Sequence, residues 1–146
     1  ITRSPSQIAA FYEGREFSKA AIEETRNYCF PAVIVINKTA DTMWLIIDDW
    51  RFSSNGHPIK RIKRDYWKQR WKKIGLSMAH QSTFGWTLMP EVRDLQIDEG
   101  VGGSIPIEMQ AEPYTINARL RTGQSKQGPM ISVIINNVTC PKDSVP

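Results

Sequence analysis

Short segments with the character of β-strands, separated by turn residues, fill most of the chain after Pro31. The expected strands are 32–36, 43–47, 84–89, 105–109, 114–121 and 130–135. The first two are compact apolar runs rich in β-branched residues, and together we expect them to form a hairpin. Apolar and polar side chains alternate along 105–109 and 114–121, as in half-buried strands. This succession of short strands predicts a β-sandwich or barrel-like fold.

The segment that precedes these strands has a helical character. Ser4, Pro5 and Ser6 form a helix start, with a Ser cap and a Pro near the first turn. We expect helix over residues 5–28, divided in two at Gly14. The predicted fold class is therefore mainly β with an N-terminal helix.

Length and composition fit a single domain that spans residues 1–146. Of the 146 residues, 40% are hydrophobic and 23% are charged, and no internal repeat or low-complexity linker divides them. We expect a β-rich core over 32–140 and a frayed tail over 141–146. No segment approaches the roughly 18 apolar residues of a membrane-spanning helix.

The two cysteines lie towards opposite ends of the chain, at Cys29 and Cys140. A disulfide between them would close a loop of about 110 residues, worth roughly 4–5 kcal/mol in the chain-entropy model. Sequons at Asn37 and Asn137 each follow an apolar run, where a strand gives way to a turn, and predict glycosylation. Together these features indicate a secreted protein from an oxidising compartment. The alternative is that both sequons are chance matches and both thiols are reduced.

The positive charge of the chain is concentrated in residues 60–73, KRIKRDYWKQRWKK. Eight Lys or Arg and one Asp give this run a charge of +7, whereas the whole chain carries +4, so the remainder sums to −3. The candidate binding residues are Lys60, Arg61, Lys63, Arg64, Tyr66, Trp67, Lys68, Arg70, Trp71, Lys72 and Lys73. A basic run interleaved with Trp suits a partner that is anionic at its surface, such as an anionic membrane, a glycan or nucleic acid. The alternative is that Trp67 and Trp71 fill the core while the charged side chains face solvent.

Whether this run is helix or strand is left open by its pattern. In a helix Trp67, Trp71 and Ile74 share one face, whereas in a strand Trp67, Gln69 and Trp71 do.

Residues for catalysis are few. Basic secreted ribonucleases use two His, or a His and a Glu, so His57 and His80 with Glu91 or Glu108 are the candidates for this alternative function. No His or Cys cluster has zinc spacing, and no motif for a cofactor is present. We expect neither a metal nor a cofactor.

The order of elements is similar to the actinoporin-like cytolysins, a family of small secreted pore-formers. The resemblance rests on residues 32–37, Thr39, Trp44, the segment Arg51-Phe52-Ser53-Ser54, and Gly56. In that family the first β-hairpin similarly runs from an apolar strand through an Asn-bearing loop to a Trp strand and a small-residue turn. The resemblance implies a sandwich with one edge that faces a membrane or a glycan.

The dense aromatic lipid-headgroup site of that family is reduced here to Phe84, Trp86 and Tyr114, so its phosphocholine pocket is not carried over. The function expected from the sequence is binding of membrane lipid or glycan surfaces through residues 60–73, as in a toxin, effector or defence protein. A secreted effector that binds an acidic protein is a further alternative.

Overall fold

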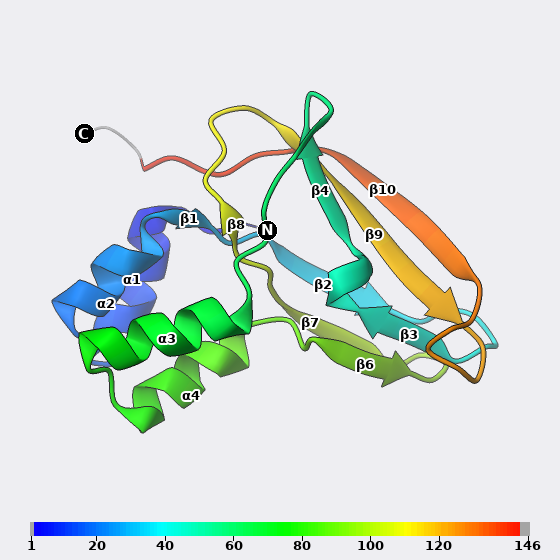
Figure 1. Ribbon diagram of the computed structural model, residues 1–146, viewed down its shortest axis with the longest axis horizontal. Coiled ribbons are helices and arrows are strands. Elements are labelled where there is room, and N and C mark those ends of the chain that lie inside the picture. The colour runs from blue at the N-terminus through cyan, green and yellow to red at the C-terminus, as the bar shows by residue number, and fades with distance from the viewer. Residues whose placement is uncertain (1, 144–146) are drawn as a thin grey trace.

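The computed structural model describes residues 2–143 and places the α-helices at one end of the molecule and the main sheet at the other (Figure 1). The helices are α1 (Pro5–Glu13), α2 (Lys19–Thr25), α3 (Arg64–Ile74) and α4 (Met78–Thr87), with a short 3-10 helix η1 (Ile47–Asp49). The strands are β1 (Tyr28–Cys29), β2 (Ala32–Ile36), β3 (Met43–Ile46), β4 (Arg51–Ser54), β5 (His57–Pro58), β6 (Val92–Leu95), β7 (Gly100–Ser104), β8 (Ile107–Glu108), β9 (Tyr114–Thr122) and β10 (Met130–Val138).

The main sheet is built around β9. One edge of β9 pairs with β10, and its other edge pairs with β4 near its start and with β3 near its end; β5 and β6 extend the sheet outward from these. All of these pairings are antiparallel. Side chains on β9 alternate between buried and half-buried, as the sequence pattern predicts. The expected fold class, mainly β with an N-terminal helix, is confirmed.

A second sheet, made of β2 and β7, packs over the main one. Val33, Val35 and Val101 contact the apolar core under β9, so the strands form a double layer. The absence of a side chain at Gly103, which lies on the same face of β7 as Val101, permits a close approach of the backbone: a Cβ there would lie 2.5 Å from the backbone nitrogen of Met89. The chain at the end of α4 can therefore lie directly against β7.

The predicted hairpin over residues 32–50 is wrong, although both of its strands are present. β2 pairs with β7, whereas β3 pairs with β6 and β9, so the two strands belong to different sheets. The loop between them is fixed by Asn37, whose side chain is completely buried and bonds to the backbone of Asp41 and Leu95. This anchoring directs the two strands to separate partners.

The N-terminal helical segment divides at Gly14, as expected. A capping box at Ser4 and Gln7 begins α1, and the Ser18 side chain caps α2. Helix ends at Thr25, earlier than predicted, because Cys29 joins the short strand β1 that pairs with β8.

Two further helices interrupt the expected β-rich core. The basic run forms α3, which ends at Gly75 in the left-handed conformation (φ 82°). The strand predicted over 84–89 is wrong, because residues 78–87 form α4, capped by the Ser77 side chain. Only Leu88, just after the helix, makes an isolated bridge to a strand residue.

The helices enclose a second apolar core, separate from the core of the sheets. Its buried members are Ile8, Ala9, Tyr12, Phe17, Ala21, Ile22, Phe30, Ile62, Trp67, Trp71, Leu76, Phe84 and Leu88. The two Trp rings stack with centroids 5.3 Å apart, and the Phe84 ring lies 4.8 Å from one and 5.0 Å from the other. Trp67 and Trp71 are each only 2% exposed. These rings hold α3 and α4 together.

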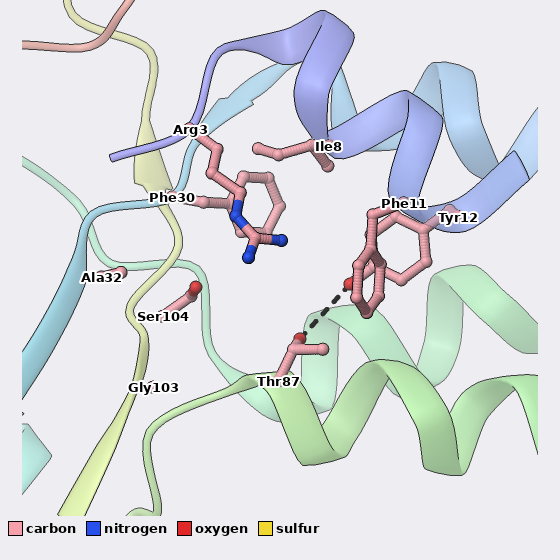
Figure 2. Close-up of a pocket in the computed structure, with 9 residues that line it drawn as sticks. All are labelled: Arg3, Ile8, Phe11, Tyr12, Phe30, Ala32, Thr87, Gly103 and Ser104. Carbon is pink, nitrogen blue, oxygen red and sulfur yellow. Dashed lines mark hydrogen bonds between the residues drawn. The ribbon is translucent and has the colours of Figure 1, made fainter. Parts of the chain in front are cut away.

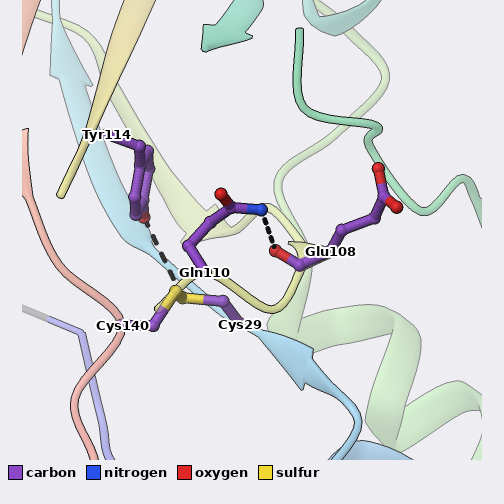
Figure 3. The surroundings of a disulfide bond; sticks show 5 residues. All are labelled: Cys29, Glu108, Gln110, Tyr114 and Cys140. Carbon is purple, nitrogen blue, oxygen red and sulfur yellow. Dashed lines mark hydrogen bonds between the residues drawn. A yellow bond between two sulfur atoms is a disulfide. The ribbon is translucent and has the colours of Figure 1, made fainter. Parts of the chain in front are cut away.

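The disulfide between Cys29 and Cys140 is confirmed (Figure 3). It joins β1 to the chain just after β10, across 111 residues of sequence. The tail beyond it is attached as far as Asp143, whose carboxylate accepts a hydrogen bond from the Ser6 backbone N–H (2.8 Å) and lies 3.5 Å from Arg26. The prediction of a frayed tail is thus wrong for residues 141–143, and residues 144–146 lie outside those described.

Truncation of the central aromatic ring pair should unfold the helical end of the molecule. We expect Trp67→Ala to lower the free energy of unfolding by about 3–5 kcal/mol, because it removes a fully buried indole from a closely packed cluster. Trp86→Ala is the matched control: Trp86 is 90% exposed, so its loss should change stability by no more than about 0.5 kcal/mol. Urea unfolding followed by circular dichroism measures both, and equal effects of the two substitutions would contradict the assignment.

Candidate binding surface on the helical hairpin

The helix α3 settles which side chains of the basic run can reach a partner. Trp67 and Trp71 face inward and are buried, so their assignment as ligand contacts is wrong. The spacing of four and three residues places Trp67, Trp71 and Ile74 on one side of α3 over two turns, where they pack in the aromatic cluster. The charged residues occupy the remaining faces.

The arginines of the run have structural partners. Arg61, with a side chain 12% exposed, donates two hydrogen bonds of 3.1 Å to the Glu91 carboxylate and one of 2.5 Å to Asp48. This guanidinium lowers the pKa of the Asp48 carboxyl. Arg64 donates to the backbone oxygens of Gly85 and Met89, at 3.4 and 3.1 Å. These contacts tie the start of α3 to the end of α4 and to η1.

A buried carboxylate anchors the other side of α3. Glu24 on α2 is 6% exposed and accepts a hydrogen bond from Arg70 Nε at 2.9 Å. Its second oxygen accepts from the Tyr66 hydroxyl. The Tyr28 hydroxyl lies 2.5 Å from that of Tyr66, and since the Tyr66 proton goes to Glu24, Tyr28 is the donor in this pair. Burial, followed by the bond to Glu24, raises the pKa of Tyr66.

The lysines differ from the arginines. Lys63 lies 3.4 Å from Asp48, but Lys60, Lys68, Lys72 and Lys73 are exposed and form no ion pair within residues 2–143. At about 100° per residue, Lys72 and Lys73 lie on the side of α3 away from Trp67 and Trp71, and Lys68 lies on the flank of the buried face. The portion of the run that is free to bind a partner is therefore a set of lysines, with no Arg or Trp among them.

An exposed Trp lies on the neighbouring helix. Trp86 on α4 is 90% exposed and Met78 is 74% exposed, and Ser82 between them is exposed as well. These residues follow one another at a spacing of four, so they form one stripe on the outer side of α4. Helix α4 contains no Asp, Glu, Lys or Arg. The stripe is therefore uncharged and partly apolar.

The two helices form an antiparallel hairpin, joined by residues 75–77 and side by side in Figure 1. Arg64 at the start of α3 bonds to Gly85, the residue before Trp86. The unpaired lysines of α3 and the apolar stripe of α4 thus belong to one compact unit, which we call the α3–α4 surface: Lys68, Lys72, Lys73, Met78, Ser82 and Trp86.

Trp86 was absent from the binding residues selected on sequence, because residues 84–89 were expected to be a strand. Ser77, which can cap the start of a helix, was the sequence signal that residues 78–87 are helical. A helix that starts at residue 78 places Phe84 and Trp86 about 200° apart, so that one is buried and the other exposed.

The candidate ribonuclease residues are not brought together. His57 lies in the exposed β4–β5 hairpin, whereas His80 lies on α4 at the other end of the molecule (Figure 1), with its Nε2 3.1 Å from the Arg15 oxygen. Glu91 is engaged by Arg61, and Glu108 accepts a hydrogen bond from the Lys60 backbone N–H at 2.8 Å. Within residues 2–143 no hydrogen bond joins either histidine to either glutamate.

The two sequons differ in their surroundings. The Asn37 amide nitrogen donates both of its hydrogens, to the oxygens of Asp41 (2.8 Å) and Leu95 (2.9 Å), and the Thr39 N–H and hydroxyl donate to its oxygen. A glycan cannot be attached to this buried amide without breaking the loop, so the prediction for Asn37 is wrong. Asn137 is exposed, at the end of β10.

Comparisons of the chain with protein-family models, with curated proteins and with solved structures find no match. Among residues 2–143, no helix is long and apolar enough to cross a membrane. The same residues contain no group of three His, Cys, Asp or Glu side chains suited to hold a metal ion.

The free energy of unfolding should fall in strongly alkaline solution, and ionisation of Tyr66 should contribute to this fall. Its folded-state pKa lies above the value of about 10 in an unfolded chain, so above pH ~10 the unfolded state binds fewer protons than the folded state. The stabilisation is complete below pH ~10 and is lost as the pH rises through the folded-state pKa. Burial also raises the pKa of Tyr114, to about 12, which acts in the same direction.

We expect Tyr66→Phe to make the alkaline fall in unfolding free energy shallower and to cost about 1.5 kcal/mol at neutral pH, through loss of a hydrogen bond to a carboxylate. Tyr28→Phe is the comparison: it keeps the bond from Tyr66 to Glu24 and removes only the smaller contribution of Tyr28 to the pKa of Tyr66, so its effect on the alkaline slope should be smaller. Urea titrations between neutral pH and pH ~11 measure both. An unchanged alkaline slope in Tyr66→Phe would contradict this role.

Proposed function

We propose that this protein is secreted and binds anionic lipid surfaces through the α3–α4 surface. The observation that carries the proposal is a Trp side chain, 90% exposed, on the helix packed beside one that carries three unpaired lysines. A Trp kept almost wholly in water is costly unless it has a partner, and Trp is enriched at membrane interfaces because its ring is apolar with one polar N–H. The Cys29–Cys140 disulfide supports an oxidising compartment.

The lysines supply the attraction. Each Lys near an anionic membrane contributes on the order of 1 kcal/mol at moderate salt, so Lys68, Lys72 and Lys73 together contribute about 3 kcal/mol. Trp86 and Met78 then supply the apolar contact. An uncharged helix beside a charged one matches the depth profile of a membrane interface, where headgroups lie above acyl chains. This division of roles favours a lipid surface over a glycan, which offers no apolar layer.

Loss of the lysines should release the protein from anionic vesicles. The triple substitution Lys68→Gln, Lys72→Gln and Lys73→Gln should weaken binding to phosphatidylserine-containing vesicles roughly 100-fold. Trp86→Ala should weaken binding at physiological salt, where the charge attraction is screened. Co-sedimentation with neutral and anionic vesicles at low and physiological salt measures both, and entrapped dye reports leakage.

The matched control is Lys19→Gln, Lys126→Gln and Lys142→Gln, which removes the same charge from exposed lysines outside the α3–α4 surface. An equal loss of binding in the control would show that only the net charge of the protein matters, and would contradict binding through the α3–α4 surface. Absence of binding to anionic vesicles, together with binding to heparin or RNA, would replace lipid by another polyanion.

A further inference from the structure

A pocket of about 460 Å³ lies between α1, the end of α4 and the paired strands β2 and β7 (Figure 2). It is separate from the α3–α4 surface, since α4 turns its Thr87 side towards α1 and its Trp86 side outward. A volume of this size lies in the range of pockets that hold small organic ligands.

The walls of the pocket are apolar and its charge is positive. Ile8, Phe11, Phe30 and Ala32 provide carbon surface. Arg3 is the one charged residue of the lining, and within residues 2–143 it forms no ion pair. Its guanidinium lies 5.6 Å from the centroid of the Phe11 ring and points into the space between Phe11 and Phe30 in Figure 2. An unpaired guanidinium above apolar walls favours an anion that carries an apolar body.

The hydroxyl groups of the lining are not equivalent. Thr87 Oγ1 donates to the Phe84 backbone oxygen at 2.6 Å, so the 3.3 Å contact between Tyr12 and Thr87 is a hydrogen bond donated by Tyr12. The hydroxyl hydrogens of Tyr12 and Thr87 are therefore both engaged within the protein. Ser104 Oγ makes no hydrogen bond among the described residues, and Figure 2 shows it facing the same space as the Arg3 guanidinium. Arg3 and Ser104 are thus the two donors that remain for a ligand.

The floor of the pocket is rigid. Ala32 and Ser104 are directly paired across β2 and β7, so their side chains share the face that lines the pocket. The Met89 backbone N–H bonds to the Ser104 oxygen at 2.9 Å and fixes the end of α4 against β7. The backbone that carries the Ser104 hydroxyl is therefore held in place before a ligand arrives.

We infer that this pocket binds a small amphipathic carboxylate, with its anionic group between Arg3 and Ser104 and its apolar body against Ile8, Phe11 and Phe30. The ligand is a free monomer, so this site operates independently of vesicle binding by the α3–α4 surface. The apolar body of the ligand can be a linear acyl chain or an aromatic ring, since either can pack against these apolar side chains.

Titration with decanoate, followed by amide NMR of the full chain at concentrations below micelle formation, tests the assignment. We expect saturable shifts of the Ala32, Gly103 and Ser104 amides. Decanol, which has the same chain without the charge, should bind at least roughly tenfold more weakly, because a hydrogen bond to a charged group is lost. A parallel titration with 1-naphthoate shows whether the site prefers an acyl chain or an aromatic body.

Two variants locate the site. Arg3→Gln should raise the dissociation constant for decanoate roughly tenfold or more, whereas Arg93→Gln, the same change at an exposed residue outside the pocket, should leave it unaltered. Ala32→Leu should fill the pocket and abolish binding, and Ala79→Leu on the outer side of α4 is its control. Amide spectra of all variants show whether the fold is kept.

The assignment is overturned by any of three results: no saturable shift with either carboxylate, equal affinity for decanoate and decanol, or undiminished affinity in a folded Arg3→Gln variant. Failure of vesicle binding with intact decanoate binding would reject the proposed function alone.

Discussion

The helical half of the molecule depends on the contact between Trp67, Trp71 and Phe84. The centroids of these three rings lie within 5.3 Å of one another. Trp67 and Trp71 come from α3 and Phe84 from α4, so the contact joins the two helices. Phe30 and Tyr12 extend the cluster to the start of β2 and to α1. Rings of this size bury more apolar surface than any other side chains, so a short helical segment can form a core of its own beside the sheets.

Within the basic run, the arginines and the lysines have different surroundings. Arginine binds carboxylates and backbone oxygens in a fixed planar geometry and tolerates partial burial, whereas the strongly hydrated ammonium of lysine remains in water. Arg61, Arg64 and Arg70 accordingly hold α3 to its neighbours. Lys68 and Lys72 are left facing solvent. In the basic run, the arginines therefore stabilise the fold, whereas the lysines remain exposed at the surface.

Sequence reasoning succeeded where the pattern is long and failed where it is short. The alternation of β9 and the start of β10 could be predicted, as could the disulfide, because the chain has only two cysteines, one after the N-terminal helical segment and one after the last strand. The partner of β2 could not, since five β-branched and small residues fit any strand and the choice of β7 depends on glycines far along the chain. Short apolar runs such as 84–89 suit helix and strand equally.

For the candidate site the same limit applied. The exposed lysines were identified from charge alone, but the pattern of residues 60–73 places both indoles on one face in a helix and in a strand alike, so it could not show which structure forms. The Asn37 sequon shows the converse: its Asn and Thr are a glycosylation pattern in sequence and a hydrogen-bonded turn in the fold. In both cases the tertiary environment, which the local sequence does not contain, decides whether a side chain is buried or accessible.

The disulfide also determines how the molecule responds to mechanical force. Tension applied through the segments before Cys29 and after Cys140 crosses the S–S bond directly and bypasses the chain between the two cysteines. The covalent path through the sheets and the α3–α4 hairpin is therefore bypassed, and these elements feel the force only through their side-chain contacts with α1 and α2. Helices α1 and α2 lie within the loaded path, and α1 supplies one wall of the pocket that Arg3 overlooks. Pulling would separate that wall from a floor that stays in place, so the pocket would open while the rest of the fold remained intact.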